Sequence, residues 1–406
     1  MSKRNQHRVG YKQTKAGWIP VDWSVCSFND ILARTMQPVN VDSENSYEEI
    51  GIKSHGKGIF HKAPVLGVEL GNKAVFWVQV PSLMFNIVFA WEQAVAVSSE
   101  RERGKIASHR FPMYRPRSEG IDLHYVCYYF LTKKGKHLLG LASPGGAGRN
   151  KTLGQGDLAL LPVPLPRLPE QVRIAAIIST WNNAIELTRR LHESKIQRKK
   201  ALMQQLLTGK KRLRGSTEEW KEYRLGDLFV ERTETNKAHL PLLAITGGRG
   251  VILANEIDRK DASAEDKSSY KRIAPGDIGY NTMRMWQGVS AVSGLEGIVS
   301  PAYTVCVPNA TVDVRFMGYL FKFPPVVNSF HRHSQGLVSD TLNLKFPHFA
   351  RIKVKIPHVD EQQRIAEVLS TVDHEIDGLE KNLTALERQK RGLMQKLLTG
   401  EVRVRV

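Results

Sequence analysis

Two long segments of this chain carry apolar residues at alternating spacings of four and three. The clearer pattern begins at Ile365, just after Asp360 and Gln363, whose capping-box spacing predicts a helix start at Asp360. Such a heptad seam is typical of a helix that packs along another helix, although a pair of ordinary core helices would show a similar face. The seam positions are Ile365, Leu369, Val372, Ile376, Leu379, Leu383, Leu386, Lys390, Leu393 and Leu397.

The other segment, residues 170–207, has the same spacing but a polar middle around His192 and Lys195. Leu187 and Leu191 offer an apolar contact on a shifted face in that region. We predict a helix about 57 Å long, at 1.5 Å per residue, which is longer than a typical domain helix. The positions that match the clearer seam are Ile174, Ile178, Trp181, Ile185, Thr188, His192, Lys195, Lys199, Leu202 and Leu206.

The two helical segments are copies of one another. Residues 166–209, which end in LMQQLLTG, align without gaps on residues 357–400, which end in LMQKLLTG, at an offset of 357 − 166 = 191. Roughly 17 of 44 aligned positions are identical, which is too many for unrelated segments. A globular domain followed by a helix is therefore used twice. Weaker upstream matches pair Trp23, Asp30, Asn86 and Trp91 with Trp220, Asp227, Asn281 and Trp286.

The globular parts contain short β-rich runs separated by Gly and Pro turns. Examples are KAVFWVQV at 73–80, YTVCVP at 303–308 and RIKVKIP at 351–357. These patterns favour an α/β (α+β) fold with an internal pseudo-two-fold repeat. The predicted segments are a first domain at 1–165, a first helix at 166–212, a second domain at 213–356 and a second helix at 357–406.

Charge suggests the class of partner. Lys and Arg total 59 against 40 Asp and Glu, a formal net charge of +19. A polyanion such as nucleic acid fits this charge, and an anionic membrane surface is the competing partner. No run of 18 apolar residues and no apolar signal core follows the basic N-terminus, so we expect neither a membrane span nor export, and a cytoplasmic location. Cys26, Cys127 and Cys306 are far apart and predict neither a disulfide framework nor a zinc site.

Catalytic motifs are missing from the sequence. GIKSHGKG at 51–58 resembles a phosphate loop, but Gly58 stands where Ser or Thr should bind magnesium. We find no GxSxG, no HExxH, no GxGxxG after a strand and no amino-methyltransferase signature. Paired histidines such as His331 and His333 have no cysteine or carboxylate at ligand spacing. We therefore predict no catalytic residue and no metal site.

Basic and amide side chains recur in probable loops of both copies. Each loop alone is better explained as a solvated basic loop, but recurrence in both copies favours contact with phosphates and base edges. Trp91 and Trp286 lie in apolar stretches and are predicted to be core residues. The candidate nucleic-acid contacts are Lys53, His55, Lys57, Arg101, Arg103, Lys105, His109, Arg110, Arg149, Asn150, Lys151, Arg249, Arg284, Gln287, His331, Arg332, His333 and Gln335.

Two variable domains, each followed by an EQxxIA helix start and an LMQxLLTG helix end, resemble the specificity subunit of Type I restriction-modification systems. The stretches FNIVFAW at 85–91, GYNTMRMWQG at 279–288 and GIVSPAY at 297–303 also resemble target-recognition segments of that family. The resemblance covers essentially the whole chain. The resemblance also implies that residues of the helix motifs dock the partner subunits. These residues are Glu170, Gln171, Ile174, Leu202, Leu206, Glu361, Gln362, Ile365, Leu393 and Leu397.

The resemblance implies a subunit without catalytic activity. Each recognition domain would read one half of a bipartite double-stranded DNA site, while the two helices pair antiparallel and set the gap. Two methyltransferase subunits, which carry S-adenosylmethionine, would dock on the helices, and a restriction and translocation subunit would use ATP and magnesium. No cofactor is expected in this chain. Adjacent major-groove half-sites should be centred about 34–36 Å apart, and FAWEQ against MRMWQ suggests that they differ in sequence.

Two other classes of function remain open on the sequence. One is a nuclease or methylase that acts alone, which would need a catalytic signature. The other is a basic coiled-coil scaffold that binds RNA or acidic proteins without sequence specificity.

Overall fold

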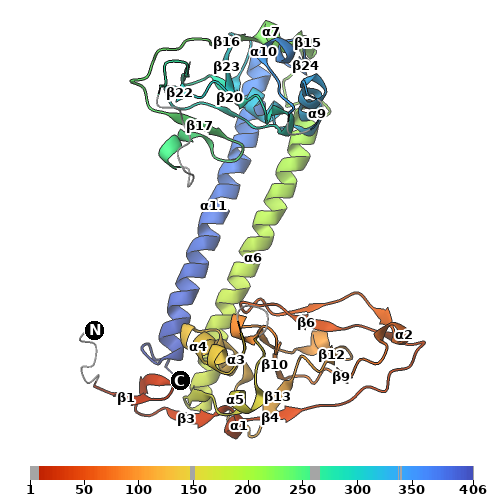
Figure 1. The fold of residues 1–406 in the computed structure, drawn as a ribbon, viewed down its shortest axis with the longest axis vertical. Coiled ribbons are helices and arrows are strands. Elements are labelled where there is room, and N and C mark those ends of the chain that lie inside the picture. The colour runs from red at the N-terminus through yellow and green to blue at the C-terminus, as the bar shows by residue number, and fades with distance from the viewer. Residues whose placement is uncertain (1–8, 147–150, 257–265, 337, 339–340, 406) are drawn as a thin grey trace. The chain divides into compact units, whose positions relative to one another are not determined.

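The computed structural model describes residues 9–146, 151–256, 266–336, 338 and 341–405. The chain forms two compact units, residues 1–188 with 382–406, and residues 189–381. Each unit contains one globular domain and part of both long helices, α6 (Leu168–Leu206) and α11 (Val359–Leu398) (Figure 1). We call the globular parts domain 1 and domain 2. The predicted segment limits stay a prediction, because the units divide the chain within the helices.

Domain 1 is built on a four-stranded antiparallel sheet with the order β11-β10-β13-β4. Its strands are β1 (Tyr11–Thr14), β2 (Gly17–Pro20), β3 (Ser24–Ser27), β4 (Leu32–Thr35), β5 (Ser46–Tyr47), β6 (Ile50–Ile52), β7 (Ile59–His61), β8 (Val65–Leu66), β9 (Val75–Trp77), β10 (Leu83–Phe85), β11 (Val95–Val97), β12 (Ile106–Ser108), β13 (Met113–Pro116) and β14 (Pro162–Leu165). Its helices are α1 (Phe28–Ile31), α2 (Gly67–Leu70), η1 (Ala90–Glu92), η2 (Glu100–Glu102), α3 (Leu123–Phe130), α4 (Lys133–Leu141) and α5 (Gln155–Ala159).

Domain 2 is built on a four-stranded antiparallel sheet with the order β16-β23-β20-β21. Its strands are β15 (Lys221–Arg224), β16 (Phe229–Glu231), β17 (Leu243–Thr246), β18 (Gly250–Leu253), β19 (Lys271–Ile273), β20 (Ile278–Asn281), β21 (Ser290–Val292), β22 (Gly297–Val299), β23 (Tyr303–Pro308) and β24 (Lys353–Ile356). Its helices are α7 (Leu225–Leu228), η4 (Ala254–Glu256), η5 (Met285–Gln287), α8 (Val314–Leu320), α9 (Pro324–His333) and α10 (Phe346–Phe349).

The two domains repeat one topology. Strands β4, β13, β10 and β11 of domain 1 take the places of β16, β23, β20 and β21 in domain 2, and the pair β3–β14 corresponds to β15–β24. The predicted mixed fold and internal repeat are thus confirmed. The strand predicted at 303–308 is β23, whereas only Val75–Trp77 of the run at 73–80 forms a strand.

Local capping fixes the helices that lie beside the sheets. Asp122 accepts a hydrogen bond from the backbone N–H of Tyr125 at the start of α3, and Asp313 accepts one from that of Phe316 at the start of α8. These caps satisfy backbone donors that the first helical turn leaves unpaired. In domain 1 the apolar face of α3 is buried with the sheet residues Leu83 and Phe85.

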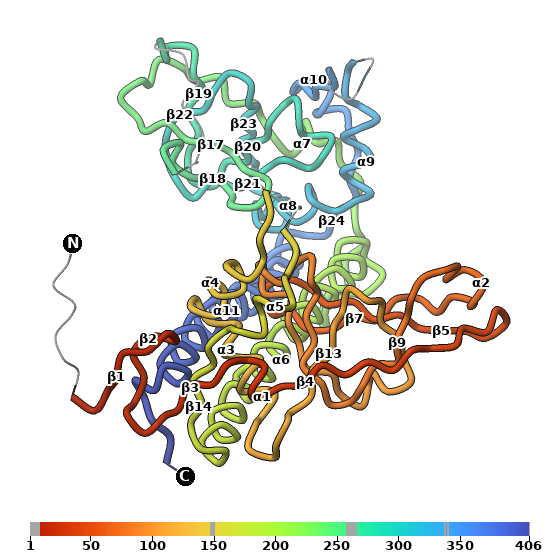
Figure 2. The backbone as a smooth tube through the Cα atoms, turned by 60° about the horizontal axis from the view of Figure 1, so that its bottom comes forward, coloured from red at the N-terminus to blue at the C-terminus, as the bar shows by residue number. Residues whose placement is uncertain are grey.

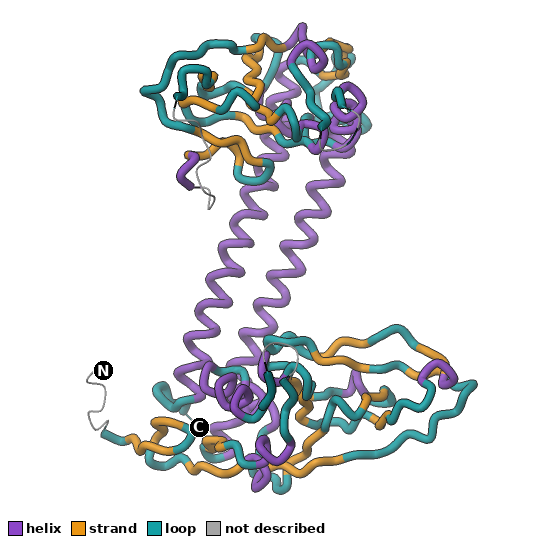
Figure 3. Tube along the Cα trace, in the orientation of Figure 1, coloured by secondary structure: helices purple, strands orange, loops and turns teal. Residues whose placement is uncertain are grey.

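Domain 1 also has an extension with its own small core, which contains Tyr47, Leu70, Val75 and Ile106. Figure 2 shows β5, α2 and β9 running away from α6 in this extension, and Figure 1 shows α2 near its far end. Figure 3 shows that the globular parts consist of short strands and helices joined by long loops, whereas α6 and α11 are continuous. Exposed loops therefore make up much of the surface of each domain.

The long helices pack against each other within each unit. In unit 1, Ile174 near the start of α6 shares a core with Leu397 near the end of α11. In unit 2, Leu206 near the end of α6 shares a core with Ile365 near the start of α11. The helices are therefore antiparallel in both units, and every predicted seam position is buried or half-buried. α11 begins at Val359, so the predicted cap at Asp360 is wrong by two positions and His358 precedes the helix.

The shifted face predicted for the middle of α6 is also wrong. Leu187 is 65% exposed and Leu191 is 48% exposed. The polar residues keep the original seam because they pair across it: Lys195 contacts Glu375 at 2.5 Å and Lys199 contacts Asp373 at 2.5 Å. A seam can thus continue through polar positions when acidic partners face them.

The repeated LLTG motif terminates both helices. Gly209 and Gly400 follow the last turns with φ values of 69° and 70°, a left-handed conformation that glycine adopts without steric cost. A Cβ atom on Gly400 would come within 2.4 Å of Pro20. Glycine is therefore required at this position by both the backbone conformation and the close approach.

Candidate nucleic-acid interface

The loop between β6 and β7 carries the first group of predicted contacts, Lys53, His55 and Lys57. All three side chains are exposed. Neither lysine has an acidic partner among the described residues, and Lys53 Nζ lies 5.7 Å from the centre of the Phe60 ring. Unpaired cations on an exposed loop can neutralise phosphates.

The same loop does not form a phosphate loop. The N–H groups of Lys53, His55 and Gly56 donate to the carbonyl oxygens of Gly58, Glu92 and Gln93 at 3.0, 2.7 and 3.0 Å. A phosphate loop needs such N–H groups free to point at the ligand. The positive charge of this loop is therefore carried by its side chains alone.

Beside the loop lies a cleft of about 430 Å³ in domain 1. Its walls combine cations with the aromatic rings of Phe60, Phe89 and Phe111. Asn86 adds an amide side chain to the same wall. Cations and aromatic faces together suit a charged ligand with flat bases.

Near η2, domain 1 neutralises some of its own predicted contacts. Arg103 donates two hydrogen bonds to Glu100 at 2.6 and 2.7 Å, and Lys105 forms an ion pair with Glu48. Arg101 is exposed and has no acidic partner in the described part of the chain. Of the three, Arg101 is thus the one whose charge is free to face a polyanion.

The remaining predicted contacts of domain 1 lie in other loops. His109 and Arg110 are exposed between β12 and β13. Lys151 Nζ lies 5.3 Å from the centre of the Trp91 ring, a cation–π contact. Arg149 and Asn150 lie outside the described residues.

In domain 2 the predicted contacts fall into two places. Arg249, in the β17–β18 turn, is tied to Glu256 at 3.0 Å. Arg284 and Gln287, at η5, are exposed, and so are the residues at the end of α9. The His331 ring lies 5.9 Å from that of Trp286, which brings α9 against η5. The predicted residues in this part of domain 2 are His331, Arg332 and His333 at the end of α9, with Gln335 just beyond it.

Residues 86–93 and 281–288 form the same turn twice, which we call the Asn–Trp turn. The Asn86 and Asn281 side chains accept from the N–H of Val88 and Met283 at 3.2 and 3.0 Å. The indole N–H groups of the two tryptophans donate to the carbonyl oxygens of the same two residues, both at 3.1 Å. The prediction that Trp91 and Trp286 are core residues is wrong, because both rings are half-buried and hold the turn together.

At the helix starts, the residues predicted for docking have roles inside the chain. Glu170 and Glu361 are 5% and 4% exposed, and Gln171 and Gln362 are 1% and 0% exposed. Gln171 accepts from the N–H of Asp122 at 3.0 Å, and Gln362 repeats this contact with Asp313 at 2.9 Å. The glutamines thus join each helix to the cap of α3 or α8, and a docking role for the four residues stays a prediction.

The two buried glutamates are held by arginines that the sequence analysis did not single out. Arg403 donates to Glu170 at 2.7 and 2.9 Å, and Arg212 donates to Glu361 at 2.8 and 2.7 Å. Hydrogen bonds to Glu170 and Asp22 raise the pKa of Arg403. We call these pairs the clasps. The repeat in the sequence could have identified these two arginines, because 403 − 212 = 191, which is the offset of the helices.

The apolar residues predicted on the helices lie in the two cores. Ile174 and Leu397 are buried in the core of unit 1, and Leu393 packs against it half-buried. Leu206 and Ile365 are buried in the core of unit 2, where Leu202 packs against it. They join each helix to its domain.

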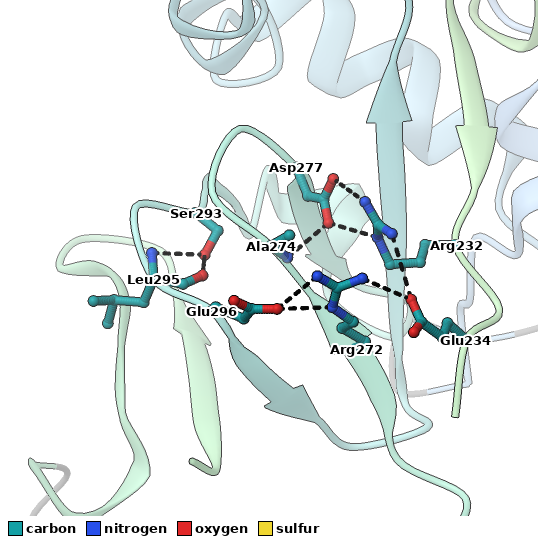
Figure 4. Close-up of polar contacts among 8 residues, drawn as sticks. All are labelled: Arg232, Glu234, Arg272, Ala274, Asp277, Ser293, Leu295 and Glu296. Atoms are coloured by element: carbon teal, nitrogen blue, oxygen red, sulfur yellow. Dashed lines mark hydrogen bonds and ion pairs between the residues drawn. The ribbon is translucent and has the colours of Figure 1, made fainter. Parts of the chain in front are cut away.

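An ion-pair network fixes the sheet of domain 2 (Figure 4). Asp277, which is 2% exposed, accepts from Arg232 at 2.8 and 3.0 Å and from the N–H of Ala274 at 2.8 Å. Beside it, Arg272 joins Glu234 and Glu296. These arginines are neutralised inside domain 2, so their charge is not available to a ligand.

The model of a protein family, the type I restriction modification DNA specificity domain, matches residues 86–196 and 217–388 of this chain. The chain belongs to this family. It is 23% identical to a putative type I restriction enzyme MjaX specificity subunit of Methanocaldococcus jannaschii, over 97% of both chains.

Solved structures of specificity subunits share the fold. The HsdS subunit of Thermoanaerobacter tengcongensis matches 95% of this chain and 98% of its own, with 16% identity and a TM-score of 0.52. The S subunit of a type I restriction-modification system from M. genitalium matches 92% of this chain and 96% of its own, with 14% identity and a TM-score of 0.57.

The ranges that match the specificity-domain family begin at the first Asn–Trp turn and include the second. The basic loop at 53–58 precedes the matched range. Within the described ranges, no helix is both long and apolar enough to cross a membrane. The described residues also contain no group of three or more His, Cys, Asp or Glu side chains that could hold a metal ion.

Proposed function

We propose that this chain is the DNA sequence-specificity subunit of a type I restriction-modification complex. Each domain reads one half of a bipartite, asymmetric, double-stranded DNA target. The observation that carries the proposal is the repeat: one domain topology and one Asn–Trp turn occur twice with different exposed side chains. Two similar scaffolds with different surfaces suit two half-sites of different sequence.

Charge supports contact with DNA. Lys53, Lys57 and Arg101 in domain 1, and Arg332 in domain 2, are exposed and have no acidic partner among the described residues. Phosphate contacts from such side chains set affinity and position, whereas base-edge contacts set sequence preference. Binding should therefore weaken as salt rises while the preference for one target remains.

The helices α6 and α11 set the gap between half-sites and provide seats for two methyltransferase subunits. The internal repeat gives the two partner copies equivalent surfaces. Because the glutamates and glutamines at the helix starts are buried, this contact would fall on other, exposed residues of the two helices. Catalysis belongs to the partners: the methyltransferase brings S-adenosylmethionine, and the restriction and translocation subunits use ATP and magnesium.

The test is a map of N6-methyladenine across the host genome, with this gene intact and deleted. The proposal expects a bipartite methylated motif with two different halves, present only when the gene is intact. A host that expresses the methyltransferase but shows no change of motif on deletion would contradict the proposal. Identical inverted halves would contradict the asymmetric target.

A further inference from the structure

The Asn–Trp turn has the same backbone in both domains. Gln93 and Gly288 end it in the left-handed conformation, with φ values of 62° and 77°. Their N–H groups donate to the carbonyl oxygens of Ala90 and Met285 at 2.7 and 2.8 Å. The turn is thus one rigid scaffold whose side chains at matching positions can be compared directly. An offset of 195 aligns Phe89 with Arg284 and Glu92 with Gln287.

In domain 1 the basic loop at 53–58 covers this turn. The N–H groups of His55 and Gly56 donate to the carbonyl oxygens of Glu92 and Gln93. The Ser54 hydroxyl donates to the Glu92 carboxylate at 2.9 Å. The Glu92 side chain is therefore occupied inside the domain, and the exposed groups above the turn belong to the loop.

In domain 2 no hydrogen bond among the described residues places a loop over the turn in this way. Arg284 and Gln287 are exposed, and neither side chain has a hydrogen bond or an ion pair with any residue that the structure describes. Met283 between the two ends of the turn is 49% exposed. A Cβ atom on Gly288 would lie 3.1 Å from Val327 of α9, so α9 packs closely against the end of the turn.

We propose that the two domains read DNA with different elements of the same scaffold. Arg284 and Gln287 contact base edges directly from the turn in domain 2, whereas Lys53, His55 and Lys57 contact DNA from the loop above the turn in domain 1. An arginine can bond both O6 and N7 of guanine, and a glutamine can bond N6 and N7 of adenine. This assignment rests on the proposed function, because it names the reading residues of the proposed surfaces.

The experiment uses the full chain with its methyltransferase in the host, and maps methylated motifs for single variants. Arg284→Ala and Gln287→Ala should each relax one base position in one half of the motif, with a roughly 5- to 150-fold loss of preference. The other half should stay unchanged. In the double variant Lys53→Ala with Lys57→Ala, any change in base preference should fall in the half of the motif that domain 1 reads. The half that domain 2 reads should stay unchanged.

Two further variants separate base reading from charge and folding. Arg284→Lys keeps the charge and can still reach O6 and N7 of guanine, but it loses the planar fork, so its base preference should fall between those of wild type and Arg284→Ala. Arg351→Ala removes an exposed charge that follows α10, and should leave the motif unchanged.

The outcomes are distinguishable. A wild-type chain that specifies no bipartite motif would overturn the proposed function itself. A wild-type motif that stays intact in Arg284→Ala and in Gln287→Ala would overturn only this assignment. Weaker methylation of all targets alike in Arg284→Ala, with no base position relaxed, would also overturn it, because that result indicates a phosphate contact.

Discussion

Removal of the Arg403 guanidinium should weaken unit 1 and leave unit 2 intact. Arg403 donates two hydrogen bonds to Glu170, whose side chain is 6% exposed, and two more to Asp22 at 2.9 and 2.8 Å. Its guanidinium also lies 5.8 Å from the centre of the Trp23 ring. In Arg403→Ala, the Glu170 carboxylate would stay buried, and among the described residues the Trp23 indole N–H, at 3.3 Å, would be its one remaining side-chain donor.

The cost follows from the burial of the two partners. Removal of one partner of a fully buried ion pair costs about 3–5 kcal/mol. The Arg403 side chain is 41% exposed, so solvent screens part of the interaction and the cost is smaller. We expect a loss of about 2–3 kcal/mol in the free energy of unfolding of unit 1.

Hydrogen exchange on the full chain can measure this locally. Amides of α3, which contacts Gln171 through its cap, report on unit 1, and amides of α8 report on unit 2. In Arg403→Ala, α3 amides that exchange by opening of unit 1 should exchange roughly 30 to 150 times faster, and α8 amides at the wild-type rate. Arg212→Ala is the matched control. In that variant α8 amides should exchange faster, and α3 amides should exchange at the wild-type rate.

Two results would refute this account of the clasp. One is unchanged protection of α3 in Arg403→Ala, and the other is an equal loss in α3 and α8. Arg403→Lys refines the test: it keeps the charge and loses the planar fork, so its effect should lie between wild type and Arg403→Ala.

Three further predictions concern the core, pH and the network of domain 2. Leu369→Ala should cost about 2–5 kcal/mol because Leu369 is 0% exposed, whereas Leu187→Ala at 65% exposure should cost under about 0.5 kcal/mol in urea unfolding. Burial raises the pKa of Glu102, but its hydrogen bonds lower it more, so the folded pKa lies below the ordinary value of 4.5. The ionised carboxylate therefore stabilises the folded chain above about pH 4.5, and this stabilisation is lost as pH falls through the folded pKa. Glu102→Gln should reduce that loss of stability when unfolding is measured at about pH 3–5. Asp277→Asn should cost about 2–4 kcal/mol, measured by exchange of β20 amides, because Arg232 would lose its charged partner; wild-type protection would contradict this.

Local patterns in the sequence determine the helices and the repeat. The seam from Ile365 to Leu397 marks one face of α11, because a spacing of four and three places residues on one side of a helix. The LLTG endings identify both helix ends, since Gly209 and Gly400 adopt a conformation that favours glycine. These features depend on residues close in sequence. Because the chain contains two copies of the motif, the copies can also be aligned with each other.

Tertiary structure decided which charges remain free. Arg103 and Lys105 look like Lys53 and Lys57 in the sequence, but the first two are paired with Glu100 and Glu48. The seam also ran through Lys195 and Lys199, and not through the exposed leucines, because acidic residues of α11 face those positions.

The sequence by itself determined a duplicated domain and helix, a basic character and a resemblance carried by helix motifs. Only the tertiary structure showed that Arg403 donates to Glu170, 233 positions away, and that the loop at 53–58 covers the Asn–Trp turn of domain 1. In the turn of domain 2, Arg284 and Gln287 are exposed and have no side-chain partner among the described residues. The physical reason is that periodicity and turn conformation are local, whereas an ion pair or a covered surface depends on which distant segments meet. Which of its charges stay exposed and unpaired therefore follows from packing, whereas its repeat can be seen in the sequence alone.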